Sequence, residues 1–286
     1  MNTLDQLTSQ PLPPTLYHYT TQEGLLGIFE DQEIWASSSR YLNDTSEFKV
    51  GQEVARKVIA KKLHIEQDSR RTDFLKEMLE AVEDAGINVC VCSFSEIDDS
   101  LSQWRAYSNS GTGYSIGFDP NKIRSAGLAA NYILVPCIYE DAPQQAMMNM
   151  LVEDVLSELL NPSDSDRAEA EEFGERMRGG NMAYYLNRYA LTIKHPHFKA
   201  EAEWRLISKP KSFRRLRFRA GKSTIVPYDA ISLEINGAMP LNEILVGPSP
   251  HTQDAAAAIR GLLITRYPVT ARRPQVRIST VPFRNW

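Results

Sequence analysis

Apolar and polar residues follow two different spacings along the chain, and the spacing changes many times between its ends. Short runs of aromatic and β-branched residues predict strands at 16–20 and 33–39, and an apolar run predicts a buried strand at 87–95. Similar runs predict the remaining strands near 113–119, 131–139, 201–208, 223–228, 230–235, 242–247 and 274–280.

Helical spacing separates these strands. Leu25, Ile28 and Phe29 form an apolar stripe, and Thr20 and Glu23 have the spacing of a capping box, so we expect a helix that begins at Thr20. Similar stripes and end signals predict further helices at 44–63, before Gly86, at 100–107 and at 251–267.

The order of these elements sets the fold class. Strands occur early, in the middle and late, and strict strand–helix alternation fails, which argues against a doubly wound parallel sheet. We therefore predict a single α+β domain over residues 1–286. It has a Pro-rich lead-in at 1–15 and an acidic helical insertion at 143–194, which no linker isolates.

Composition and charge narrow the class of protein. With 42% hydrophobic and 24% charged residues, the chain is typical of a globular protein, and no run approaches the roughly 18 apolar residues of a membrane span. The N-terminus lacks the pattern of a signal peptide, and three cysteines without a C-x-x-C pair do not suggest a disulfide framework. We expect a cytoplasmic protein with no membrane partner.

The richest chemistry lies in the segment EAEWRLIS, residues 201–208. On a strand, Glu201, Glu203 and Arg205 would share one face. Two interpretations remain open for this face: a solvent-facing strand with a local ion pair, or a catalytic Glu-x-Glu wall.

Other motifs limit the candidate chemistries. The chain has no phosphate-binding G-x-x-x-x-G-K-[ST] loop, no G-x-G-x-x-G fingerprint and no G-x-S-x-G elbow. His195 and His197 precede the two glutamates, so a metal-dependent hydrolase is an alternative. Pro196 and Phe198 indicate a loop there, and we predict no metal site.

The basic charge gathers late in the chain. From residue 209 to the end there are thirteen Lys and Arg against four Asp and Glu. In the stretch KPKSFRRLRFRAGK (209–222), Arg215, Arg217 and Arg219 alternate with Leu216 and Phe218, which fits a strand with one charged and one buried face. The alternative is a track of guanidiniums and aromatics that contacts the phosphates of a nucleic acid.

Several motifs together resemble a bacterial family of domains of unknown function. They are YHYT, LND, CSFSE, QWRAY, GYSIGFD and EAEWRLI, and the similarity extends from about residue 16 to 210. We interpret that family as a distant relative of the ADP-ribosyltransferases. The resemblance implies a mixed, largely antiparallel split sheet with a cleft that binds NAD. It also implies an NAD-dependent ADP-ribosyltransferase or NAD glycohydrolase, with a toxin or phage-defence setting.

The resemblance also implies roles for individual residues. His18 would hold the NAD ribose, Glu203 would be the catalytic glutamate, and Glu201 would orient the acceptor. The remaining candidates for NAD contacts are Tyr19, Thr20, Ser37, Ser38, Asn43, Tyr107 and Arg205, with Trp35 as a second option for stacking on nicotinamide. Because the chain departs from the ADP-ribosyltransferases in lacking a Ser-Thr-Ser triplet and in mixing the His-type and Glu-x-Glu-type patterns, the acceptor stays open between water, protein and nucleic acid.

The reaction chemistry agrees with such a site. The bond between ribose and nicotinamide breaks through an oxocarbenium-like state, and nicotinamide leaves as a neutral molecule, so no general acid is needed. One carboxylate that faces the developing positive charge suffices.

Overall fold

The computed structural model describes residues 3–42, 46–83, 88–108, 113–161, 185–186, 188–221, 223–234, 239–267 and 273–282. Its helices are α1 (Thr3–Thr8), α2 (Gln22–Asp31), α3 (Ser46–Ile65), α4 (Ser69–Glu83), α5 (Leu101–Tyr107), α6 (Pro120–Ala129), α7 (Asp141–Leu160) and α10 (Thr252–Arg266). Its strands are β1 (Leu16–Thr21), β2 (Glu33–Ser38), β3 (Cys90–Ser95), β4 (Gly113–Phe118), β5 (Tyr132–Pro136), β6 (Glu203–Ser208), β7 (Arg217–Ala220), β8 (Ile225–Ser232), β9 (Leu241–Val246) and β10 (Gln275–Ile278). Short 3-10 helices include η2 (Ala190–Thr192), η3 (Pro196–Glu201) and η4 (Phe213–Arg215).

The strands of the described residues join in one open, mixed sheet. Its order is β10-β9-β4-β1-β3-β2-β8-β7, and β6 pairs with β3 and carries β5 as a branch. All pairs are antiparallel except β9 with β10. The fold class is therefore mixed α and β with a largely antiparallel sheet, and it does not have the parallel order of a doubly wound protein.

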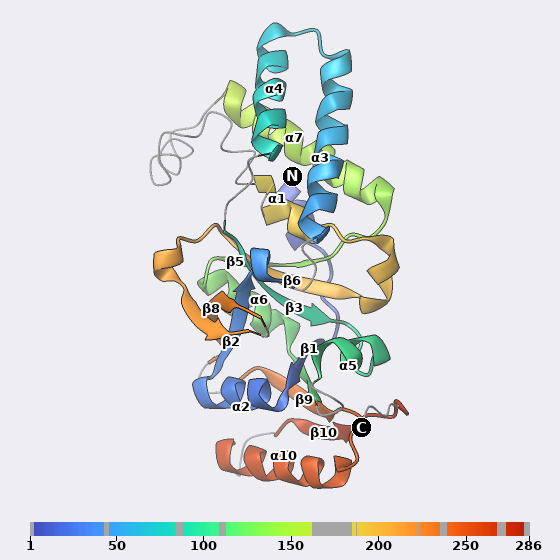
Figure 1. Cartoon of the computed structure of the whole chain (residues 1–286), viewed down its shortest axis with the longest axis vertical. Helices are drawn as coiled ribbons and strands as arrows, with labels where there is room; N and C mark the ends of the chain where they lie inside the picture. The colour runs from blue at the N-terminus through green and yellow to red at the C-terminus, as the bar shows by residue number, and fades with distance from the viewer. Residues whose placement is uncertain are drawn as a thin grey trace.

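Helices cover both faces of the sheet (Figure 1). Because side chains alternate along a strand, β3 sends Cys92 and Phe94 to one face and Val91 to the other. The first face packs against α2, α6 and α10 in one hydrophobic core. The second packs against α3, α4 and α7 in another.

The predicted helix after the first strand is present, and Leu25, Ile28 and Phe29 are buried. Its predicted start was wrong by one residue. The N-cap is Thr21, whose hydroxyl accepts a hydrogen bond from the Gly24 amide at 3.2 Å. Strand β1 continues through Thr21, which pairs with Gly113, so Thr20 stays within the sheet.

Part of the expected 143–194 insertion is α7. Its residues Leu151, Val152 and Val155 are buried in the same core as α3 and α4, so this helix is part of the domain's packing. Residues 162–184 and 187 of the predicted insertion lie outside the described residues. In the described part of the chain, no helix combines the length and the apolar character that crossing a bilayer requires.

Candidate functional site

The sheet divides along one edge of β3. Strand β6 pairs with β3 from Val91 to Ser95 and so occupies its other edge. On the edge of β3 that β6 does not occupy, β1 pairs with Ser95, and β2 pairs with Val91 and Cys90. Between these two contacts β1 and β2 separate, and Ser93 is paired with neither of them.

His18 of β1 occupies this division. Its Nδ1 lies 2.9 Å from the Ser93 carbonyl oxygen, and since a carbonyl only accepts, Nδ1 carries the proton and donates. Burial lowers the pKa of His18, and the bond to Ser93 opposes this to a smaller extent. The imidazole is therefore neutral near pH 7, and its Nε2 is left as a hydrogen-bond acceptor.

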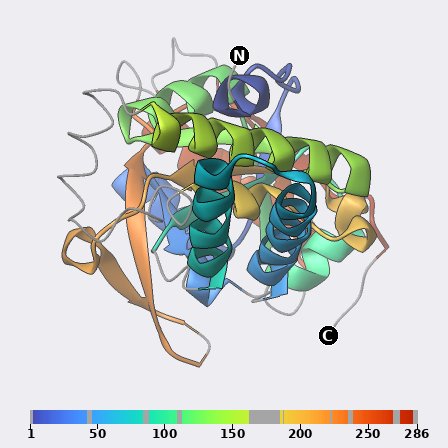
Figure 2. The ribbon, with the colours of Figure 1, turned by 90° about the horizontal axis from the view of Figure 1, so that it is seen from above.

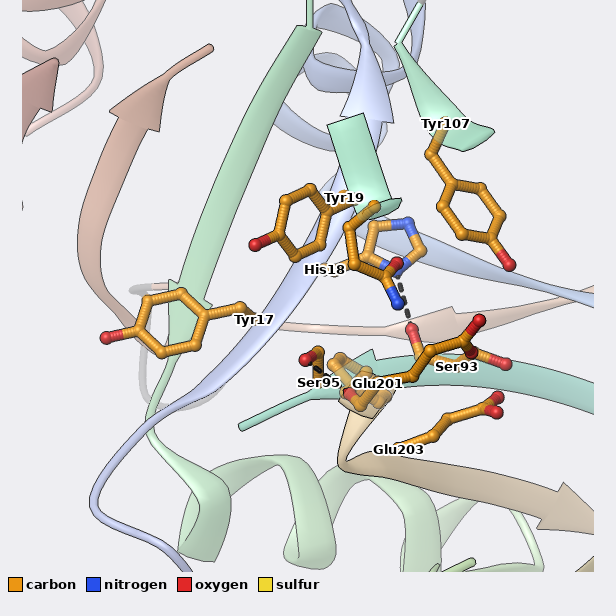
Figure 3. Close-up of a pocket in the computed structure, with 10 residues that line it drawn as sticks. Tyr17, His18, Tyr19, Ser93, Ser95, Tyr107, Glu201 and Glu203 are labelled. Carbon is orange, nitrogen blue, oxygen red and sulfur yellow. Dashed lines mark hydrogen bonds between the residues drawn. The ribbon is translucent and has the colours of Figure 1, made fainter. Parts of the chain in front are cut away.

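A pocket opens at this place, with an empty volume of about 360 Å³ that includes part of its open mouth. Its lining comes from β1, β3, α5 and the start of β6: Tyr17, His18, Tyr19, Ser93, Phe94, Ser95, Gln103, Tyr107, Glu201 and Glu203. In Figure 3 the carboxylates of Glu201 and Glu203 lie close together, the Tyr107 hydroxyl points toward them, and the Tyr17 ring points away.

The sequence predicted that Glu201 and Glu203 share one face of a strand, but in the structure they do not. Strand β6 begins at Glu203, and Glu201 is the last residue of η3. Between them Ala202 has a left-handed backbone with φ 41°. This turn is held at its carbonyl, which accepts from the Glu96 amide at 3.0 Å, and it brings both carboxylates to Lys194.

Lys194 joins the two carboxylates. Its Nζ lies 2.6 Å from Glu201 Oε2 and 2.5 Å from Glu203 Oε2. The backbone of Lys194 is fixed in turn, because its amide donates to the Ile138 carbonyl at 3.0 Å and its carbonyl accepts from Gln144 Nε2 at 2.9 Å. The ammonium group is thus placed by α7 and the segment before η3.

Glu203 lies deeper than Glu201. Arg205 holds it with two bonds, from Nε to Oε1 at 2.7 Å and from Nη2 to Oε2 at 2.9 Å, and the residue is 6% exposed. Burial raises the pKa of Glu203, but the charges of Arg205 and Lys194 outweigh burial and lower that pKa to about 2. The Glu201 side chain is 21% exposed, and of its two oxygens only Oε2 is bonded to Lys194.

Helix α5 supplies two further groups. Gln103 is buried, lines the pocket and has no hydrogen-bond partner for its side-chain amide among the described residues. Tyr107 is exposed at the pocket mouth. The hydroxyl end of the side chain is buried although the residue as a whole is exposed. This burial, with the charges of Glu203 and Glu201 adding to it, raises the pKa of Tyr107, so its hydroxyl keeps its proton.

Tyr19 lines the pocket and packs on a buried tryptophan. Its ring meets Trp104 edge to face, with the ring centroids 4.7 Å apart. Trp104 Nε1 donates to Asp99 Oδ1 at 2.8 Å, and the Tyr19 hydroxyl donates to the Ile97 carbonyl at 2.8 Å. These bonds fix α5 relative to β1.

The structure brings together five of the predicted residues: His18, Tyr19, Tyr107, Glu201 and Glu203. Thr20 is not among the residues that line the pocket; it pairs with Tyr114 near the end of β1. Arg205 is buried behind Glu203, with which it forms the local ion pair that was one interpretation of this strand, and its Nη1 donates to the Leu191 carbonyl at 2.8 Å. It does not line the pocket, so it is not placed to contact NAD there.

Three further candidates lie away from the pocket or beyond description. Ser37 accepts a hydrogen bond from Arg219, and Ser38 is buried and donates to Asn88. Both belong to the part of β2 that pairs with the start of β3, so neither supplies the predicted hydroxyl. Asn43 lies outside the described residues.

The alternative was a metal site at His195 and His197. In the described ranges, no group of three or more His, Cys, Asp and Glu side chains is placed to hold a metal ion. His195 and His197 are exposed in and beside η3, and their rings meet edge to face at 4.6 Å. A cation, the Lys194 ammonium, already lies between the two glutamates.

Sequence reasoning missed Lys194, Gln103 and the Ser93 carbonyl. Gln103 belongs to the QWRAY motif, which offered a signal, whereas Lys194 reaches the site through contacts with β5's neighbouring loop that no local pattern reveals.

Comparison with known proteins adds one finding. Residues 103–206 match the model of a family described as "Protein of unknown function (DUF2971)". The matched segment covers about a third of the chain and includes Gln103, Tyr107, Lys194, Glu201 and Glu203, but not His18. No curated protein matches the chain.

Proposed function

We propose that the pocket binds the nicotinamide riboside half of NAD and that the protein cleaves the bond between nicotinamide and ribose. ADP-ribose then passes to an acceptor or to water. The observation that carries this proposal is the convergence of His18, Glu201 and Tyr107 on one pocket at the division of the sheet. The proposal covers an ADP-ribosyltransferase and an NAD glycohydrolase alike, since both begin with this bond.

The leaving group needs no general acid from the protein. When the C1′–N bond breaks, its electron pair moves to the ring nitrogen, and the pyridinium cation becomes neutral nicotinamide. Positive charge develops on the ribose, where a nearby carboxylate stabilises it. The incoming nucleophile adds to C1′ and releases its proton to a base or to solvent.

Glu201 is better placed than Glu203 to meet the sugar. Glu203 has both oxygens engaged by cations and is almost fully buried, whereas Glu201 keeps Oε1 without a bond to Lys194. The positive charges of Lys194 and Arg205 offset the negative charges of the two glutamates. Stabilisation of the ribosyl cation therefore depends on Oε1 of Glu201, the oxygen that is not bonded to Lys194. We therefore assign the substrate contact to Glu201 and a positioning role to Glu203.

The remaining groups fit the two ends of nicotinamide riboside. Neutral His18 presents Nε2, which accepts a hydrogen bond from a ribose hydroxyl. The Tyr107 ring at the mouth offers a stacking surface, and the unpartnered Gln103 amide is the kind of group that pairs with a carboxamide.

The test has a binding arm and a product arm. Isothermal titration of the purified protein with NAD measures affinity, and NAD labelled with ³²P in the adenylate half reveals where ADP-ribose goes. We expect binding, with label appearing either as free ADP-ribose or on an added protein or RNA. No binding, no label transfer and no hydrolysis would contradict the proposal.

Two variants separate site chemistry from folding. His18→Asn retains a nitrogen donor for the Ser93 carbonyl but removes the Nε2 acceptor, so we expect weaker NAD binding with a native fold. Glu140→Gln is the matched control, because Glu140 is an exposed glutamate that pairs with Lys199 outside the pocket. It should leave NAD binding and turnover unchanged.

A further inference from the structure

Strands β7 and β8 form a hairpin that projects from the body of the protein (Figure 2). The hairpin extends the sheet beyond β2, and β7 pairs only with β8 among the described residues. Large apolar side chains near it are exposed: Phe213 by 47% and Phe218 by 57%. This surface is therefore unlike the solvated side of an ordinary edge strand.

The register of the strands places an aromatic and basic row on one face. Ser37 lies opposite Tyr228, and Tyr228 lies opposite Arg217. Partners in neighbouring strands share a face, and so do alternate residues of one strand. The face thus carries Trp35, Ser37, Arg217, Arg219 and Tyr228, which we call the hairpin face.

Side-chain contacts hold this face together. The rings of Trp35 and Tyr228 lie 4.5 Å apart and are tilted by 35°, with Trp35 39% exposed and Tyr228 buried. Arg219 Nη2 donates to Ser37 Oγ at 3.0 Å, while its Nε is buried without a hydrogen-bond partner among the described residues. Arg217 lies along the sheet and forms an ion pair with Glu33, with 2.7 Å between Nη1 and Oε2. The aromatic ring and the guanidiniums are fixed side by side.

The interpretation of residues 209–222 as a strand with one charged and one buried face does not account for this arrangement. A strand with one charged and one buried face would bury Phe218, but Phe218 is exposed, and Arg215 belongs to η4 instead of the strand. Leu216 alone follows the expected pattern and is buried. Phe218 lies on the face of β7 opposite to Arg217 and Arg219, so the exposed aromatic ring on the arginine face is that of Trp35.

We propose that the hairpin face binds single-stranded nucleic acid. Unpaired bases stack on exposed aromatic rings, and arginines contact the phosphates between them. Trp35, supported from beneath by Tyr228, is the stacking surface, and Arg217 and Arg219 lie beside it. Residues 209–219 hold six Lys and Arg and no Asp or Glu, and of these six Lys211 pairs with Asp229 and Arg217 pairs with Glu33.

Charge and chemistry favour this occupant over others. A second copy of the chain would bring the same excess of basic residues against this surface, which opposes pairing through the β7 edge. A double helix hides the faces of its bases, so it could use the arginines but not Trp35. This inference does not depend on NAD, because the hairpin face is separate from the residues that line the pocket.

The test is fluorescence anisotropy with a labelled 20-nucleotide oligouridylate, measured without NAD at several salt concentrations. We expect binding that weakens with salt, with a logarithmic slope of about 0.7 for each phosphate contacted. Trp35→Ala should weaken binding about 10-fold, in line with the loss of one stacked base, and Trp35→Phe should restore most of it. Arg217→Glu should weaken binding at least as much.

The matched control is Arg260→Glu, the same charge change at an exposed arginine of α10. Circular dichroism checks that each variant is folded. The proposal is overturned if the oligonucleotide does not bind at 50 mM salt, or if Arg260→Glu weakens binding as much as Arg217→Glu. Binding that Trp35→Ala leaves unchanged, or tighter binding to phosphatidylserine vesicles than to the oligonucleotide, would also overturn it.

Discussion

Replacement of Glu203 by glutamine tests the charge network behind the pocket. Glutamine keeps the size of the side chain but removes the negative charge that Arg205 and Lys194 share. Lys194 retains Glu201, whereas Arg205, which is 2% exposed, loses the carboxylate that accepts two of its bonds. The variant therefore removes a buried ion pair.

The size of the effect follows from the pKa of Glu203. The pKa is lowered from 4.5 to about 2, because the charges of Arg205 and Lys194 outweigh the effect of burial. At about 1.36 kcal/mol for each pKa unit, this shift contributes roughly 3 kcal/mol to the free energy of unfolding at pH 7. Removal of one partner of a buried ion pair costs a similar amount, about 3 to 5 kcal/mol.

The dependence on pH gives a second signature. Since the pKa in the folded protein is depressed, the stabilisation is complete above pH 4.5 and is lost as the pH falls toward 2. Urea titrations of wild type and Glu203→Gln at pH 7, 4 and 3 should show a difference that shrinks by about 1.4 kcal/mol per pH unit below 4.5.

Glu140→Gln is the control for this experiment too, because the Glu140–Lys199 pair is exposed and solvent screens such pairs, so its loss should change stability little. A Glu203→Gln variant that loses no more stability than Glu140→Gln, or a difference that does not change with pH, would refute the reasoning.

Three further predictions concern the pocket. Gln103→Leu removes a buried amide without breaking a hydrogen bond among the described residues, so the free energy of unfolding should stay the same or rise. In a nicotinamide-release assay, the KM for NAD should increase at least 5-fold. An unchanged KM would argue against recognition of the carboxamide by Gln103. Tyr107→Ala should also raise KM, and Tyr107→Phe should not, because the ring and not the hydroxyl provides the stacking surface. Burial lowers the pKa of His18, so wild type should lose stability in urea titrations as the pH falls below 6.5, when the unfolded chain binds a proton that the folded protein does not; His18→Asn should lack this part of the loss, and identical pH profiles would contradict it.

The sequence predicted much of the local structure, because local patterns decide it. The stripe of Leu25, Ile28 and Phe29 determined which face of α2 is buried, and the alternation around Trp204 and Leu206 determined which side of β6 faces the first core. The end of β1 was harder, since Thr20 and Thr21 are equally good caps. The pairing of Thr21 with Gly113, a distant residue, decides between them.

The site was predictable in its residue types but not in its geometry. Strand alternation predicted a common face for Glu201 and Glu203, yet Ala202 takes a left-handed conformation that alanine rarely adopts. A tertiary hydrogen bond from Glu96 holds that conformation, and the arrival of Lys194 depends on Ile138 and Gln144. Such contacts join distant parts of the chain, so no pattern within the segment 201–208 contains them.

The most direct measurement of the central claim is nicotinamide release from NAD by the purified protein, followed by chromatography under steady-state conditions. Wild type, Glu201→Gln and Glu140→Gln should be compared at saturating NAD. The account predicts that wild type and Glu140→Gln release nicotinamide at the same rate and that Glu201→Gln releases it at least about 100-fold more slowly while still binding NAD. Release that is absent from wild type, with no binding of NAD, or that is equal in wild type and Glu201→Gln, would contradict it.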